Sequence, residues 1–223
     1  MTASKEDYLK AIYHAGGLHK RVATKEVAQR LGIASASVTE MIARLAKEDL
    51  LTYEPYKGSQ LTQRGLEACV NVVRSHELWE VFLVQYLGYS LSDAHRDAEA
   101  LEHATSPLLT ERLDDLLKHP AACPHGAIIP RPGSIPPERD MLQLSTLPVG
   151  APAVIGQIEE EKELLDYLER LGLGVGIHIT VEEYGEYDGP LALTAENHPV
   201  QLSRKAADQI WVLPDKTEDK RRL

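Results

Sequence analysis

The segment from His95 to His103 contains four side chains at helical spacing that could together bind a divalent metal ion. On an α-helix, His95, Glu99, Glu102 and His103 stand at positions i, i+4, i+7 and i+8, so they share one stripe. Two carboxylates and two imidazoles make a poor core, and as a surface they are unfavourable because like charges are close neighbours. A divalent cation would neutralise the stripe. The alternative is a solvated helix face that carries histidines by chance.

Three other groups of residues offer the same donor chemistry. His76 and Glu80 stand four residues apart on one face of a preceding helical stretch. Cys123 and His125, two residues apart in a proline-rich segment, could reach one ion through a thiolate and an imidazole. The acidic run 159–161 opens a predicted helix, where acidic residues are also ordinary N-terminal chemistry. Taken together, the two helical groups favour a metal site.

The elements that must position these side chains begin with a predicted winged helix-turn-helix. The periodicity predicts a helix over 5–16, a second helix with Thr24 as N-cap that ends at Gly32, and a third from Ser35 or Ser37 to Glu48. Two short strands, 50–54 and 59–62, follow as a hairpin. A generic three-helix bundle would look similar as far as Leu50, but the hairpin favours DNA binding.

Six polar residues are the candidates for DNA contact. Small polar residues at the start of the third helix would contact base edges, and Glu40 could accept a hydrogen bond from the N4 amino group of cytosine. Arg44 and Lys57 would contact phosphates or the minor groove. Helix capping is the alternative role for the two serines. The candidates are Ser35, Ser37, Thr39, Glu40, Arg44 and Lys57.

Helical patterning continues over 62–86 and again over 92–118, and Leu78, Val81 and Phe82 suit a packing or dimer face. Six prolines between Pro120 and Pro137 indicate a linker. Beyond Pro148 the pattern changes to short β-like runs around one helix, 160–171, which predicts a small separate β-barrel. Its runs are 153–158, 175–183, 191–194, 200–202 and 209–213.

The composition limits the class of protein. The 223 residues carry a formal net charge of −10, but basic residues outnumber acidic ones eight to five between Lys20 and Arg64. Between Arg74 and Lys118, acidic residues outnumber basic ones nine to four. No apolar run is long enough for a membrane span, and the N-terminus carries no apolar signal segment. Two cysteines fit a reducing cytoplasm, where we expect the protein to act.

Several motifs resemble the diphtheria toxin repressor / manganese transport regulator family of metal-dependent transcription factors. They are SKEDYLKAIY, the winged helix, RSHELWEVFL, DAEALEH and the linker CPH. The resemblance implies a mainly α fold with a small β domain. A winged helix-turn-helix over 1–72 would precede a helical metal-binding and dimerisation domain with its Pro-rich linker over 73–140. An SH3-like (FeoA-like) β-barrel over 141–214 and a charged tail over 215–223 would complete the chain.

The resemblance also implies roles for particular residues. Asp7 stands where the family places a ligand on the first helix, and Glu99, Glu102 and His103 stand where it places its central ligands. A second site would use His76, Glu80 and His95, with Cys123, His125 and either Glu159 or Glu160, of which we favour Glu160. Iron-responsive members usually carry cysteine in place of Glu99. An oxygen-rich ligand set with Asp7 and Glu99 suits a hard ion such as Mn²⁺, and Fe²⁺ is the alternative. Lys10 replaces a second carboxylate of some two-domain members, which favours two separated sites.

We therefore expect a homodimeric repressor of metal-uptake genes that binds palindromic operator DNA when metal joins Asp7 to the helical domain. No membrane partner is expected. A metal-dependent hydrolase is a remote alternative, because the chain has no HExxH motif, nucleophile elbow or phosphate-binding Gly loop. A winged-helix repressor indifferent to metal is another alternative. We expect no enzymatic activity.

Overall fold

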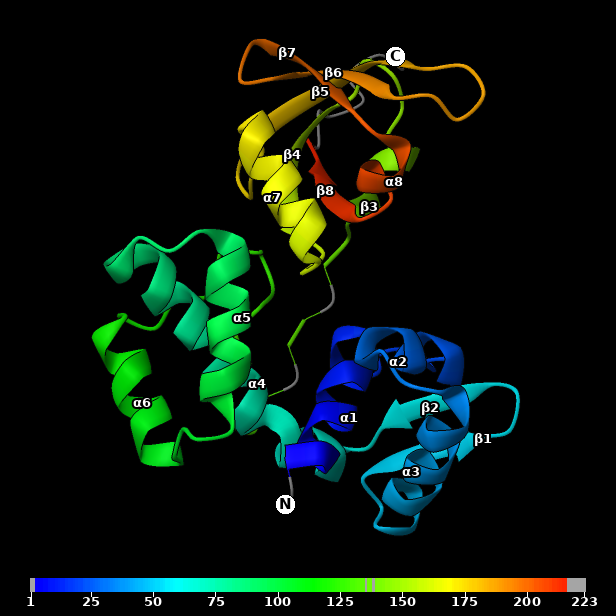
Figure 1. Ribbon diagram of the computed structural model, residues 1–223, viewed down its shortest axis with the longest axis vertical. Helices are drawn as coiled ribbons and strands as arrows, with labels where there is room; N and C mark the ends of the chain where they lie inside the picture. The colour runs from blue at the N-terminus through cyan, green and yellow to red at the C-terminus, as the bar shows by residue number, and fades with distance from the viewer. Residues whose placement is uncertain (1–2, 135, 138, 216–223) are drawn as a thin grey trace, which may run out of the picture. The chain divides into compact units, whose positions relative to one another are not determined.

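The computed structural model describes residues 3–134, 136–137 and 139–215 (Figure 1). The chain divides into two compact units. The first comprises Met1–Phe82, Asp97–Ala121 and Ile128–Glu138, and the second comprises Leu83–Arg96, Ala122–Ala127 and Arg139–Leu223. Within the described ranges, no helix combines the length and the apolar character needed to span a membrane. Of the predicted charged tail, 216–223 lie outside the described residues.

The first unit contains the predicted winged helix, drawn from blue to cyan in Figure 1. Helices α1 (Ala3–His14), α2 (Thr24–Leu31) and α3 (Ser35–Lys47) precede an antiparallel hairpin of β1 (Leu51–Glu54) and β2 (Gly58–Leu61). Apolar residues at helical spacing give the helices a common core, in which Leu9, Ile12, Val38, Ile42 and Leu45 are fully buried. This core determines which faces of α1 and α3 point away from it.

A close backbone approach fixes the wing. Val22 and Ser59 exchange backbone hydrogen bonds of 2.7 and 2.9 Å, which tie the hairpin to the segment before α2. Gly58 has φ +103°, and a Cβ atom there would lie 2.2 Å from the Val22 carbonyl oxygen. Only glycine allows this approach.

The starts of α2 and α3 differ from the sequence prediction. Thr24 is the first residue of α2, and the N-cap is Ala23, which makes no side-chain cap. Ala34 likewise precedes α3 without a side-chain cap, so the capping role considered for Ser35 and Ser37 is wrong. Gly32 ends α2 in the left-handed conformation, as predicted.

Three helices form the rest of the first unit and part of the second: α4 (Gln63–Leu87), α5 (Leu91–Glu102) and α6 (Pro107–Leu116). The expectation of continuous helix over 92–118 is wrong. The Ser106 side chain caps α6 by accepting from Leu109 N at 3.2 Å, and Pro107 follows at the first turn, where it cannot continue a preceding helix. His103 therefore lies in the turn just after α5.

Buried polar contacts join α4 to α6. Ser75 and Thr110 hydroxyls lie 2.7 Å apart, and Arg74 donates to Asp114 Oδ2 at 2.6 Å. The same carboxylate oxygen accepts from Arg131 of the linker and lies 3.0 Å from His119 Nδ1. On α4, Leu78 and Val81 are buried within the single chain, as expected of a packing face.

The second unit contains an antiparallel sheet of six strands in the order β3-β8-β4-β5-β6-β7. The predicted strands appear as β4 (Pro152–Ile158), β5 (His178–Tyr184), β6 (Leu191–Ala195), β7 (His198–Leu202) and β8 (Ile210–Pro214). The strands of this sheet share an apolar core of their own. Helix α7 (Lys162–Leu171) buries Leu164, Leu165 and Leu168 in it. The short elements β3 (Leu142–Gln143), η1 (Leu144–Thr146) and α8 (Arg204–Ala207) were not predicted, because runs of two to four residues carry no periodicity.

The Asp114 contacts lead to a stability prediction. Burial favours the neutral acid, but hydrogen bonds from His119, Arg131 and Arg74 outweigh it and lower the pKa of Asp114. Asp114→Asn should lower the free energy of unfolding by about 3 kcal/mol at neutral pH, because it removes the buried charged partner of Arg74 and leaves only the half-exposed Glu111. Because the folded-state pKa is depressed, this contribution is present above pH ~4 and is lost as the pH falls through the folded pKa.

Urea unfolding at pH 7 and at pH 3 would measure both effects. Asp115→Asn is the matched control, since Asp115 is half exposed and pairs only with surface groups among the described residues. It should change the free energy of unfolding by less than about 0.5 kcal/mol. Equal effects of the two substitutions would contradict the role assigned to Asp114.

Candidate metal centre and DNA interface

Three predicted ligands from distant parts of the chain come together in the first unit. His103 Nε2 lies 2.8 Å from Asp7 Oδ1 of α1 and 3.3 Å from Glu102 Oε1 of α5. One ligand atom from each of these residues lies within 4.8 Å of the others. Glu6, which sequence reasoning missed, places Oε2 3.0 Å from His103 Nδ1. Its only sequence signal was its position next to Asp7.

The Glu102 side chain is fully buried, and its two oxygens face different partners. Oε2 accepts from Lys10 Nζ at 2.6 Å and lies 2.6 Å from His76 Nδ1. Oε1 is buried and has no hydrogen-bond partner among the described residues. A buried carboxylate oxygen without a donor is costly, and a cation held with Asp7 and His103 would satisfy it.

Burial and the neighbouring carboxylates together shift the pKa values of this cluster. Burial raises the pKa of Asp7, against the opposing effect of His103, and Glu102 and Glu99 add to the rise. Burial lowers the pKa of His103, but the hydrogen bond to Glu6 and the charges of Glu102 and Asp7 outweigh it, so that pKa is raised. A carboxylate and imidazole set of this kind fits a divalent cation with a preference for oxygen and nitrogen ligands.

His76, Glu80 and Glu99 lie beside the cluster. His76 Nε2 is 3.0 Å from Glu80 Oε1, and both side chains are fully buried. Burial lowers the pKa of His76, but Glu80 and Glu102 raise it well above its ordinary value. Glu99 Oε1 accepts from Lys10 at 2.7 Å, and about half of the Glu99 side chain is exposed.

The remaining predicted ligands gather in the second unit. Cys123, His125 and Glu160 each have a ligand atom within 4.8 Å of the others, and Cys123 Sγ lies 3.9 Å from His125 Nδ1. His95 Nδ1 is 3.6 Å from Glu160 Oε2, and the His95 and His125 ring centroids are 6.0 Å apart. Glu161 instead contacts Lys205 and Gln209. His95, Glu99 and Glu102 lie at helical spacing along α5, as predicted, and His103 lies in the turn just after it.

The loop that carries Cys123 and His125 is held against β4. Ile158 N donates to the His125 carbonyl oxygen at 2.9 Å, and Cys123 N donates to Ala127 O at 2.9 Å. Gly126 has φ +90°, and a Cβ atom there would lie 2.2 Å from the Gly156 carbonyl oxygen. Glycine is therefore required for the loop to lie this close to the strand.

All six candidate DNA-contact residues are exposed. Five of them lie on α3 among its exposed residues, and Thr39 Oγ1 also donates to Ser35 O at 2.9 Å. Lys57, near the tip of the wing, lies 2.8 Å from Glu54. Sequence reasoning missed Tyr56, which has a positive φ of 66° and is fully exposed at the wing tip.

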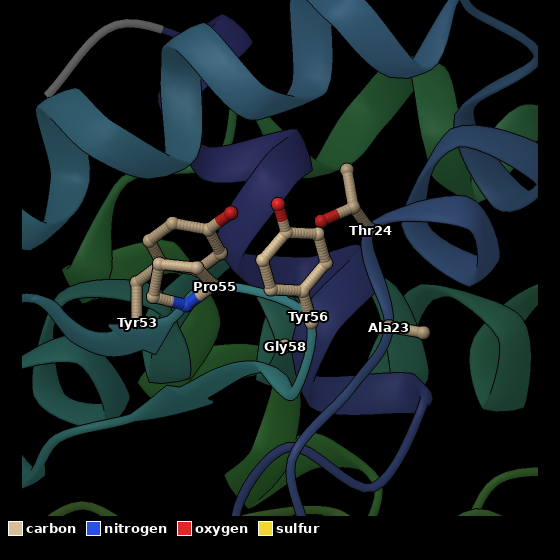
Figure 2. A pocket seen from close by; sticks show the side chains of 6 residues that line it. All are labelled: Ala23, Thr24, Tyr53, Pro55, Tyr56 and Gly58. Atoms are coloured by element: carbon tan, nitrogen blue, oxygen red, sulfur yellow. The ribbon is translucent and has the colours of Figure 1, made fainter.

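A pocket of about 390 Å³ lies between the wing and the start of α2. Figure 2 shows Tyr53 and Tyr56 from the hairpin and Thr24 from α2 around it. The pocket adds tyrosine and threonine hydroxyls to the exposed surface of the winged helix. Such hydroxyls are common donors to DNA phosphates.

Comparisons with known proteins agree with this architecture. Family models match three consecutive segments: the iron dependent repressor N-terminal DNA binding domain over 1–59, the metal binding and dimerisation domain of that repressor over 62–131, and a FeoA domain over 142–214. The HTH-type transcriptional regulator MntR of Geobacillus kaustophilus is 35% identical over 118 residues, which are 53% of this chain and 83% of that protein.

Two solved structures resemble nearly the whole chain. A manganese-dependent transcriptional repressor in complex with manganese has a TM-score of 0.85 and 32% identity, covering 94% of this chain and 99% of the other. ScaR with bound Cd²⁺ has a TM-score of 0.79 and 39% identity, covering 94% and 98%. The fold, the clustered side chains that could bind metal and the similar proteins together define a metal-dependent transcriptional regulator of three domains. The chain belongs to the diphtheria toxin repressor / manganese transport regulator family.

The Gly126 approach can be tested with a matched pair of substitutions. Gly126→Ala should destabilise the chain by more than the ~1–2 kcal/mol that a left-handed alanine costs, because its Cβ also meets Gly156 O. Gly150→Ala carries only the conformational cost, since Gly150 has φ +77° and open space around the added Cβ. Urea unfolding measures both. The buried Cys123 thiol should also react faster with a thiol reagent in Gly126→Ala. Equal stability of the two variants would rule out the close approach.

Proposed function

We propose that this chain is a Mn²⁺-responsive, homodimeric repressor of metal-uptake genes that acts in the cytoplasm. The observation that carries the proposal is the convergence of Asp7, Glu102 and His103, because it joins the first helix of the winged helix to the helical domain. The proposed working parts are the winged helix over 1–72, the metal-binding and dimerisation domain over 73–140 and the FeoA-like domain over 141–214.

The chain's own residues support a switch at this point. Asp7 belongs to α1, which shares a core with the proposed recognition helix α3. Glu102 is the last residue of α5, and His103 follows it directly. A divalent cation bound between the carboxylates of Asp7 and Glu102 would offset the repulsion between their negative charges. Asp7 would then tie α1 to α5. Because two recognition helices in a dimer must match major grooves about 34 Å apart, holding α1 favours the DNA-competent state.

We propose a second metal site from the resemblance and from the donors gathered in each unit. Its proposed ligands are those that the resemblance implies: His76, Glu80, His95, Cys123, His125 and Glu160. The contact of Glu160 with His95 supports Glu160 over Glu159. With a thiol and two imidazoles in the second unit, this site is softer than the Asp7 cluster.

The homodimer and its DNA are part of the same proposal. Helix α6 exposes Leu108, Leu109 and Leu116, an apolar surface suited to a second copy of the chain, and it lies in the segment matched by the metal-binding and dimerisation model. A two-fold dimer reads a palindromic operator. Ser35, Ser37, Thr39 and Glu40 would face base edges, while Arg44 and Lys57 would face phosphates.

The central test is the dependence of DNA binding on metal. In chelator-stripped, full-length protein at fixed salt, Mn²⁺ should raise affinity for a palindromic promoter fragment about 5- to 150-fold, the usual range of coupling between two sites. Asp7→Ala and Glu102→Gln should lose most of this increase. Glu163→Gln, an exposed glutamate of α7, is the matched control and should keep it. Equal binding with and without Mn²⁺ would instead leave a winged-helix repressor indifferent to metal.

An iron-responsive regulator is the second candidate, favoured by the description of the matching family model as an iron dependent repressor. Glu99, which the resemblance places among the central ligands with Glu102 and His103, supports Mn²⁺, because iron-responsive members usually carry cysteine there. The same titration with Fe²⁺ under anaerobic conditions separates the two candidates. We propose no catalytic activity, and turnover of a phosphoester or peptide that Glu102→Gln abolished would contradict this.

Lys57 provides a separate prediction for the wing. Lys57→Ala should weaken binding to specific and unrelated DNA alike and reduce the salt slope of log K by about 1, because one phosphate contact is lost. Lys162→Ala is the matched control: its ammonium is similarly exposed and similarly paired, with Asp166, but it lies in the FeoA-like domain. Fluorescence anisotropy at several salt concentrations measures the slope. A slope in Lys57→Ala equal to that of the control would refute the phosphate contact.

A further inference from the structure

The tip of the wing carries a tyrosine where its turn favours glycine. Lys57 N donates to Glu54 O at 3.1 Å, which closes a four-residue turn. Pro55 fixes a negative φ at the second position, and Tyr56 follows at the third with φ +66°. This combination defines a type II turn, whose third position favours glycine because other residues are strained at positive φ. The turn alone therefore does not explain why a tyrosine stands at this position.

The Tyr56 side chain takes no part in the core of the winged helix. It is fully exposed, whereas Tyr53 of the same hairpin packs against the core that α1, α2 and α3 share. Strained backbone that holds an exposed side chain outward is typical of residues that contact a partner molecule. Tyr56 is thus available to a partner, while Tyr53 is held in place by the core.

The two tyrosines line the pocket between the wing and the start of α2, together with Thr24. Figure 2 shows the three hydroxyl groups turned toward the same region. Within the ranges that the structure describes, none of these hydroxyls has a hydrogen-bond partner. The rest of the lining is uncharged as well: Ala23, Pro55 and Gly58. The pocket of about 390 Å³ therefore presents three neutral donors and no charge.

A DNA phosphate is the ligand that fits this chemistry in this place. Hydroxyl groups of tyrosine and threonine commonly donate to phosphate oxygens of the DNA backbone. Lys57 follows Tyr56 directly and is 72% exposed, so a strand that meets one side chain also passes the other. Thr24 begins the helix before the proposed recognition helix α3, and the first helix of such a pair crosses the backbone. The pocket thus lies between two elements that would both face the DNA backbone.

We propose that this pocket holds one phosphate of the operator backbone, and that Tyr56 closes it by donating its hydroxyl to a phosphate oxygen. The inference rests on the proposed function, in which the winged helix binds operator DNA. The contact is neutral and releases no counterion, in contrast to the phosphate contact proposed for Lys57. It fixes the position of the wing on the strand and reads no base.

The first test compares four substitutions in full-length, Mn²⁺-loaded protein. Tyr56→Phe removes only the hydroxyl, and Tyr56→Gly removes the ring and the backbone strain. Tyr187→Phe and Tyr187→Gly are the matched controls, because Tyr187 is also fully exposed, with φ +52°, but lies in the FeoA-like domain. Fluorescence anisotropy with a palindromic promoter fragment and with an unrelated duplex, each at several salt concentrations, gives the affinity and the salt slope.

The expected result is a loss of affinity without a change in slope. Tyr56→Phe should weaken binding to both duplexes about 10-fold, the usual effect of one hydrogen bond to a charged group, and should keep the wild-type slope. Tyr56→Gly should weaken binding at least as much, yet its Tm should not fall, since glycine adopts a positive φ without strain. Both Tyr187 variants should bind DNA as the wild type does.

A second test locates the phosphate. Replacing the phosphates of the promoter fragment one at a time by uncharged methylphosphonates should weaken wild-type binding at several positions. At one position in each half-site, the replacement should cost Tyr56→Phe much less affinity than it costs the wild type, because that phosphate has already lost its donor. Tyr187→Phe should follow the wild type at every position.

The outcomes separate this inference from the proposed function. Equal affinity of Tyr56→Phe and Tyr187→Phe, a reduced salt slope in Tyr56→Phe, or equal effects of every methylphosphonate on Tyr56→Phe and the wild type overturns the phosphate site. A lower Tm in Tyr56→Gly would give the ring a structural role and overturns it as well.

Wild-type protein that binds DNA equally with and without Mn²⁺ overturns the proposed metal response. In that case the comparison of Tyr56→Phe with the wild type still decides the role of Tyr56. Wild-type protein that binds neither duplex overturns both proposals.

Discussion

The buried carboxylate of Glu102 is the constraint on which the rest of the first unit depends. A fully buried carboxylate is tolerated only with charged or hydrogen-bonding partners, and Glu102 takes them from Lys10 of α1 and His76 of α4. Three helices far apart in the sequence must therefore meet around one side chain. The oxygen that these partners leave, Oε1, is the one directed at His103.

The two faces of α1 connect this carboxylate to the DNA-binding surface. Leu9 and Ile12 pack in the core shared with α2 and α3, while Asp7 and Lys10, also three residues apart, face the acidic cluster. A force that holds Asp7 and Lys10 consequently acts on α3 through packed side chains. Interiors of this density transmit small shifts, since side chains fill the space between helices.

Much of this arrangement could be predicted from the sequence, for identifiable reasons. The winged helix has regular apolar spacing and glycine signals such as Gly32, and donors such as Glu102 and His103 are recognisable by type and spacing. The break between α5 and α6 was overlooked although Ser106 and Pro107 encode it. The inward direction of Lys10 could not be predicted, because it depends on tertiary contacts and lysine is usually exposed.

A permanent cation beside the proposed metal position would limit how strongly metal can act. Lys10 already neutralises Glu99 and one oxygen of Glu102, so the metal-free chain keeps α1 attached to α4 and α5. A metal ion at the proposed position would then add the interactions of Asp7, His103 and the remaining oxygen of Glu102. A ligand shifts an equilibrium by no more than its differential affinity for the two states. Because Lys10 already supplies part of the positive charge, we expect metal binding and DNA binding to be coupled by about 1–3 kcal/mol and not through an all-or-none folding transition. Such a modest coupling suits a sensor that must release its metal when the supply falls.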